Sequence, residues 1–113
     1  MVPLSRITPA TVDVLDVLLD RAAPTWGLLV VKQAGRPTGS VYPILERLEG
    51  AGWVTSEWEN DPERSGPRRR LYELTQEGAT AAQAVVASAR SRSHAKAERA
   101  AALPRVIAVG GVA

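Results

Sequence analysis

The spacing of apolar and polar residues predicts three short helices in the first half of the chain. Residues 9–21 carry aspartates at helical spacing between mostly apolar positions, and Thr8 is placed to cap this helix. A second helix is expected over residues 26–34, where Gly35 stops it. A third is expected over residues 38–50, with an apolar inner face.

The second half of the chain changes to strand spacing and then returns to helix. Residues 53–58 and 68–74 read as strands, and the turn-forming residues between them predict a β-ribbon. Thr75 is placed to cap a long, alanine-rich helix that continues to about residue 103, where Pro104 follows. The residues after Pro104 show no clear pattern.

These elements predict an α+β fold, mainly α with a small β-wing: a winged helix-turn-helix followed by one long C-terminal dimerisation helix. We expect a DNA-binding domain over residues 1–75, a dimerisation helix over residues 76–104 and a tail over residues 105–113. The 113 residues leave room for one modest core, which the association of two chains would stabilise.

Positive charge gathers at one place, although the chain as a whole is nearly balanced. The formal net charge is only +2, from 14 basic and 12 acidic residues. Residues 64–70 contain four arginines and no acid, directly after four acids in residues 57–63. Because this run lies between two predicted strands, its side chains should cluster at a hairpin tip, where they can meet DNA phosphates. The alternative is a solvated loop without a partner.

The start of the third predicted helix has the small and polar side chains that a DNA major groove admits. Gly39 lets the backbone approach closely, and the hydroxyls of Ser40 and Tyr42 can reach phosphates or base edges. Alternatives stay open, since Thr38 and Ser40 can cap the helix and Arg47 can pair with a carboxylate. Tyr42 can also be a core residue. The residues that we assign to DNA contact are Thr38, Gly39, Ser40, Tyr42, Arg47, Arg68, Arg69 and Arg70.

The first helix has a wider apolar surface than one packing contact needs, which indicates a second contact with a partner chain. The last helix offers a face of alanines and valines that would let two helices approach closely. The alternative is a solvated, alanine-driven helix with no partner. The residues that we assign to a dimer interface are Val12, Leu15, Leu19, Ala82, Val85, Val86 and Ala89.

Several other classes of function find no support in the sequence. There is no cysteine, so disulfides and thiolate metal sites are excluded. His94 has only Glu98 at helical spacing, which is typical of a surface contact, and we expect no metal, cofactor or catalytic residue. We see no signal peptide, and the longest apolar stretch, residues 106–113, is far shorter than the roughly 18 residues of a membrane span. We therefore expect a cytoplasmic protein that is not an enzyme.

About forty residues carry a family resemblance. The matching positions are Tyr42-Pro43, Leu45, Arg47-Leu48-Glu49, Gly52, Trp58, Arg69, Tyr72, Leu74-Thr75 and Gly78. This spacing resembles the PadR family of bacterial transcriptional regulators. The resemblance implies that Ser40 and Tyr42 face DNA, that Arg69 lies in the wing, and that the C-terminal helix packs across the first helix of a second copy. It also implies a small-molecule effector at the dimer interface.

The sequence thus predicts a sequence-specific DNA-binding transcriptional regulator, a repressor that acts as a homodimer on a near-palindromic operator and responds to a ligand. Its expected partners are double-stranded DNA, a second copy of the chain and a small-molecule effector. A winged helix of the MarR type would need more helix on both sides. A winged-helix protein-interaction module without specific DNA binding is the alternative from another class; it would need an exposed apolar patch and no arginine tip.

Overall fold

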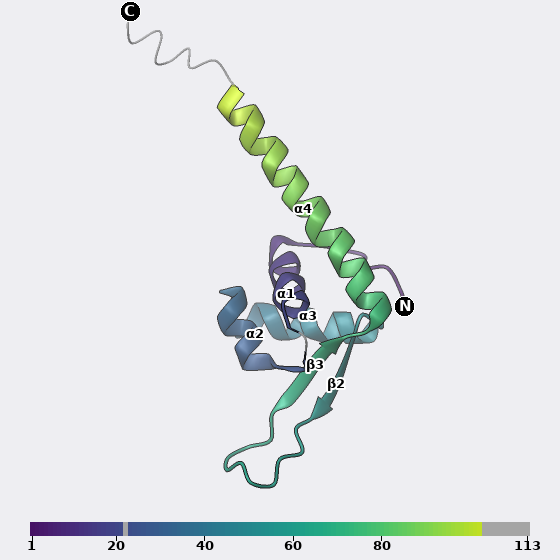
Figure 1. The fold of residues 1–113 in the computed structure, drawn as a ribbon, viewed down its shortest axis with the longest axis vertical. Coiled ribbons are helices and arrows are strands. Elements are labelled where there is room, and N and C mark those ends of the chain that lie inside the picture. Colours follow the sequence, from purple (N-terminus) through teal and green to yellow (C-terminus); the bar gives the residue numbers. More distant parts are fainter. Residues whose placement is uncertain (22, 103–113) are drawn as a thin grey trace, which may run out of the picture.

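A computed structural model of the chain describes residues 1–21 and 23–102 and shows helices gathered above a β-ribbon, with one long helix running out of the domain (Figure 1). Each predicted helix is present, although α1 ends two residues before the predicted residue 21. The elements in chain order are α1 Pro9–Leu19, β1 Thr25–Trp26, α2 Gly27–Ala34, α3 Thr38–Gly50, β2 Val54–Trp58, β3 Arg70–Leu74 and α4 Gln76–Ala102.

The helix boundaries follow from local chemistry that the sequence displays. The Thr8 hydroxyl accepts a hydrogen bond from the Thr11 amide at 3.2 Å and caps α1. Gly35 ends α2 in the left-handed conformation, with φ of 66°. The Thr75 hydroxyl accepts from the Gly78 amide at 2.9 Å and caps α4. These three caps are confirmed.

The wing is a three-stranded antiparallel sheet in the order β1-β3-β2. Val54 lies opposite Leu74 in the predicted ribbon, and Thr25 of β1 lies opposite Tyr72 on the other edge of β3. Strand β1 was not predicted, because the second helix was expected to begin at Trp26 directly after a break in the chain. A strand of two residues has no periodicity of its own and forms only because β3 supplies its hydrogen-bond partners.

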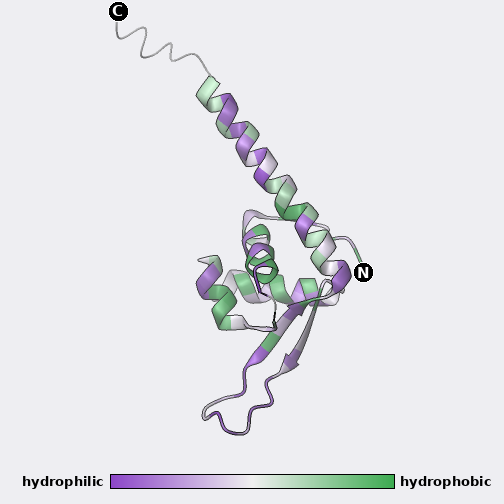
Figure 2. Ribbon diagram, viewed as in Figure 1, coloured by the Kyte–Doolittle hydropathy of each residue, from purple (hydrophilic) through white to green (hydrophobic). Residues whose placement is uncertain are grey.

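The core lies where α1, α2, α3 and the first half of α4 meet. Leu15, Leu45 and Leu48 are among its largest fully buried side chains. Ala82 and Val86 of α4 are buried in the same cluster, so this core continues past residue 75. Figure 2 shows apolar residues concentrated at this junction, whereas polar residues recur along the outer part of α4 and around the wing tip.

Candidate nucleic-acid interface

The third helix has one buried side and one open side. Its buried residues are Val41, Ile44, Leu45 and Leu48. Gly39, Pro43 and Glu46 are exposed on the opposite side. The exposed side of α3 is bordered by two flanks, one along each edge. Residues seven apart lie two turns apart on the same flank. Tyr42 and Glu49 share the flank toward the wing, and Ser40 and Arg47 share the other.

The leading end of α3 is open to an approaching molecule. Thr38 and Gly39 are exposed, and a Cβ added to Gly39 would meet no other atom within 4 Å. The N-cap of α3 is Pro37 without a side-chain cap, so Thr38 and Ser40 do not fill the capping role that the sequence left open. Within the described residues, neither hydroxyl has a hydrogen-bond partner in the protein. Both can therefore bond to a ligand.

Tyr42 is half-buried and packs against the start of α2. A Cβ added to Gly27 would come within 2.9 Å of both the Cε1 atom and the hydroxyl of Tyr42. A larger residue at position 27 would require the Tyr42 ring to shift. The side chain therefore belongs partly to the packing of α2 on α3 and keeps a part exposed at the open side of α3.

We expect Tyr42→Phe and Tyr42→Ala to separate these two roles. Tyr42→Phe should leave the thermal stability nearly unchanged and weaken operator binding by about 1 kcal/mol per half-site, because it removes one hydrogen bond. Tyr42→Ala should also lower the free energy of unfolding by about 2 kcal/mol, less than truncation of a fully buried ring costs. Thermal unfolding and operator affinity of both variants are the measurements. Full affinity in a folded Tyr42→Ala protein would remove this residue from the interface.

Tyr72 is the central residue of β3, and Tyr42 and Glu49 of α3 are among its neighbours. Its side chain is buried, and burial raises the pKa of its phenol above the ordinary value, because an apolar environment disfavours the phenolate; the nearby Arg70 opposes this in part.

The wing is fixed to α3 through Glu49. The Glu49 carboxylate accepts a hydrogen bond from the Ser56 hydroxyl and lies 3.8 Å from the Arg70 guanidinium. Arg70 also lies over the Trp58 ring, 5.0 Å from its centroid. These contacts hold the β-ribbon beside the open side of α3. Arg70 is thus a residue that positions the wing as well as a cation near its tip.

Arg69 is held in a different way. Its guanidinium lies over the Trp26 ring at 3.8 Å from the centroid, and its Nε is buried with no hydrogen-bond partner in the protein. Trp26 is in β1, so the strand that was not predicted supplies the ring on which the Arg69 guanidinium stacks. Arg68, by contrast, is exposed. Trp26 was not among the predicted site residues; its only signal in the sequence is an aromatic side chain beside a break.

The residues assigned to the dimer interface divide into two groups. Leu15, Ala82 and Val86 are 0%, 0% and 3% exposed within the single chain, so they belong to its own core and not to an open surface. The reason is that α4 packs along α1 of the same chain and covers part of its wide apolar surface. The half-buried members are Val12, Leu19, Val85 and Ala89.

The described residues form neither a cluster of metal ligands nor a membrane-spanning helix. They contain no group of three metal-ligating side chains. His94 lies 3.0 Å from Glu98, and both side chains are well exposed, as in an ordinary surface pair. No helix in the described part of the chain is long and apolar enough to cross a membrane.

An open helix held beside an arginine-bearing β-wing defines a winged-helix DNA-binding protein. The family model for the PadR-like family of transcriptional regulators matches residues 14–84. The chain therefore belongs to the PadR-like family of transcriptional regulators, which confirms the resemblance carried by the sequence.

Solved structures agree with this assignment. A candidate DNA-binding protein from Ralstonia eutropha JMP134 is 32% identical over 71% of this chain and 98% of its own, with a TM-score of 0.56. A PadR family transcriptional regulator from Eggerthella lenta DSM 2243 is 29% identical over 75% of this chain and 78% of its own, with a TM-score of 0.58. A PadR family regulator from Clostridium difficile R20291 is 25% identical over 77% and 95%, with a TM-score of 0.62. A search of curated proteins finds no match.

Proposed function

We propose that this regulator is a repressor that binds a near-palindromic operator as a homodimer. The observation that carries the DNA-binding part of the proposal is the Glu49 contact with Ser56 and Arg70, because it joins the wing to the flank of α3. A helix and a wing in fixed register can enter one major groove and meet the adjacent backbone together. In this proposal Thr38, Gly39, Ser40 and Tyr42 meet the groove, and Arg68 and Arg69 meet phosphates.

The half-buried surface between α1 and α4 supports the homodimer. A recess of about 350 Å³ lies there, with Ile7, Pro9, Val12 and Ala89 among its apolar lining residues. Beyond residue 90, the described side chains of α4 are exposed except for Ala95, which is half-buried. A helix from a second copy, packed in this recess, would cover apolar surface on both chains. Two α3 helices related by a two-fold axis would then read two half-sites.

The effector and the alternative function are tested by different observations. A small-molecule effector at the dimer interface is carried over from the family resemblance, and a ligand that changes operator affinity would establish it. A protein-interaction module would need a contiguous apolar patch. The large apolar side chains exposed in the described residues are Met1, Val2, Ile7, Leu28 and Trp58, and they come from three separate segments: the N-terminal residues, α2 and β2. Footprinting that protects a two-fold symmetric site would separate a dimeric DNA-binding regulator from such a module.

We expect Arg69→Ala to weaken binding to all duplex sequences by similar factors. Each arginine bound to a phosphate releases counterions, so the slope of log affinity against log salt should become shallower by about 0.9 for each phosphate no longer neutralised. Trp26→Ala should produce a smaller reduction in affinity that disappears in the Arg69→Ala background, because Trp26 acts through the arginine that rests on it. Salt titrations of the unmodified chain, both single variants and the double variant test this. A reduction confined to one sequence with an unchanged slope would show base readout instead.

A further inference from the structure

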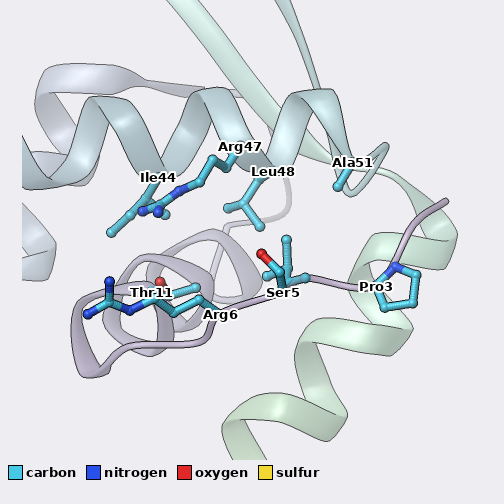
Figure 3. A pocket seen from close by; sticks show the side chains of 9 residues that line it. Pro3, Ser5, Arg6, Thr11, Ile44, Arg47, Leu48 and Ala51 are labelled. Atoms are coloured by element: carbon cyan, nitrogen blue, oxygen red, sulfur yellow. The ribbon is translucent and has the colours of Figure 1, made fainter.

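Besides the arginines of the wing, two further arginines lie close to α3, on its side that faces α1. A recess of about 170 Å³ separates the N-terminal segment from α3, with Ile44 and Leu48 in its apolar wall. Figure 3 shows Arg47 reaching from α3 and Arg6 from the N-terminal segment, with both side chains extending toward the same side of the opening. Arg47 is one of the residues predicted to touch DNA, whereas Arg6 had no assigned role.

Neither arginine has an ion-pair partner in the part of the chain that the structure describes. The two are the only charged residues that line the recess. Two aspartates on neighbouring α1 have other partners. The Asp13 carboxylate lies 2.8 Å from the Arg36 guanidinium, and the Asp16 carboxylate lies 2.8 Å from the Arg90 guanidinium. Two exposed guanidinium groups at one opening, without an acid, favour binding of an anion.

The N-terminal segment is anchored, so Arg6 has a defined place. The Val2 amide donates a hydrogen bond to the Ala51 carbonyl at 2.8 Å, beside the end of α3. The Val2 carbonyl accepts from the indole Nε1 of Trp53 at 2.7 Å. Thr8 caps α1 at the other end of the segment. Arg6 lies between these two fixed points.

The position of Arg47 places the recess relative to DNA. Arg47 follows Ser40 by seven residues and therefore lies on the flank of α3 away from Glu49 and the wing. A helix of about 10–12 Å diameter fills a major groove about 12 Å wide, so each of its flanks faces one sugar-phosphate backbone. With α3 inserted in this way, the wing would meet one backbone, and the flank that carries Arg47 would face the other.

We propose that Arg6 and Arg47 together bind a phosphate of the DNA strand across the major groove from the wing. This inference rests on the proposed insertion of α3 into the groove. It makes the N-terminal segment a part of the DNA-binding surface, and it lets each subunit bind both backbones that border α3. Such phosphate contacts set the position of α3 in the groove without reading base sequence.

Salt titrations of duplex binding by the full chain test this assignment. Arg6→Ala should lower the affinity for every duplex sequence on the order of tenfold, the usual effect of removing one charged hydrogen bond. The salt slope should become shallower by about 0.9 for each phosphate no longer neutralised. Arg6→Lys should keep most of the slope, because the charge remains, and Arg47→Ala should resemble Arg6→Ala. The matched control is Arg99→Ala, which removes the same charge from the exposed outer part of α4.

The outcomes separate this inference from the proposed function. If Arg69→Ala weakens binding while Arg6→Ala behaves like Arg99→Ala, α3 and the wing bind DNA and the inference is overturned. If the unmodified chain binds no duplex, the proposed function fails as well. A free anion is the other source of phosphate. If inorganic phosphate at constant ionic strength raises the melting temperature of the unmodified chain but not of Arg6→Ala, while DNA affinity is unchanged, the recess binds free anions instead.

Discussion

Gly78→Ala should destabilise the protein by several kcal/mol and prevent folding of much of the population at 37 °C. A Cβ at Gly78 would overlap the Trp53 carbonyl oxygen and lie within 2.7 Å of the carbonyl carbon. Neither atom can move easily, because the Trp53 carbonyl accepts hydrogen bonds from the amide of Thr75 at 3.0 Å and from its hydroxyl at 3.2 Å. The extra methyl group would force the first turn of α4 away from the wing, and overpacking of this kind costs about 1–3 kcal/mol or more.

Gly50→Ala is the matched control for this prediction. Gly50 is the last residue of α3, and a Cβ there would meet nothing within 4 Å. The same substitution should leave stability unchanged or raise it by up to about 1 kcal/mol, since alanine favours a helix more than glycine does. Chemical denaturation of both variants gives the two free energies of unfolding. Equal values would show that Gly78 is not a close-contact position.

Ala89→Glu should convert the proposed dimer into a monomer and weaken operator binding by about 10²- to 10⁴-fold. The substitution places a larger, charged side chain in the recess between α1 and α4, where a second copy would pack. Linked half-sites bind more tightly through effective concentration, and a monomer lacks that advantage. Ala82 and Val86 stay in the core, so the fold should persist. Removal of all residues from Thr75 onward would also remove those core side chains and is a less specific test.

Ala87→Glu provides the control on the same helix. Ala87 is exposed, and its two-residue offset from Ala89 places it on the opposite side of α4. This variant carries the same charge and should remain dimeric, with operator affinity close to that of the unmodified chain. Sedimentation at micromolar concentration and operator titrations measure both effects. A monomeric unmodified chain would contradict the homodimer, and a dimeric Ala89→Glu protein would place the interface elsewhere.

The sequence by itself determined the elements whose signals are local. Hydrophobic spacing located α1, α2 and α3, and the caps at Thr8, Gly35 and Thr75 set three helix boundaries, because a cap acts within a few residues of the chain. Alternation and turn residues located β2 and β3. The fold class and the family followed from the order of these elements and from the residues of α3 and the wing.

Only the tertiary structure decided which surfaces of distant segments pack against one another. Leu15, Ala82 and Val86 have the pattern of an interface, but α4 folds back along α1 and buries them within one chain. Strand β1 and the stacking of Arg69 on Trp26 depend on pairing with β3, more than forty residues away. The recess between Arg6 and Arg47 exists because the first residues are anchored at the end of α3. These features depend on long-range packing, which local periodicity does not record.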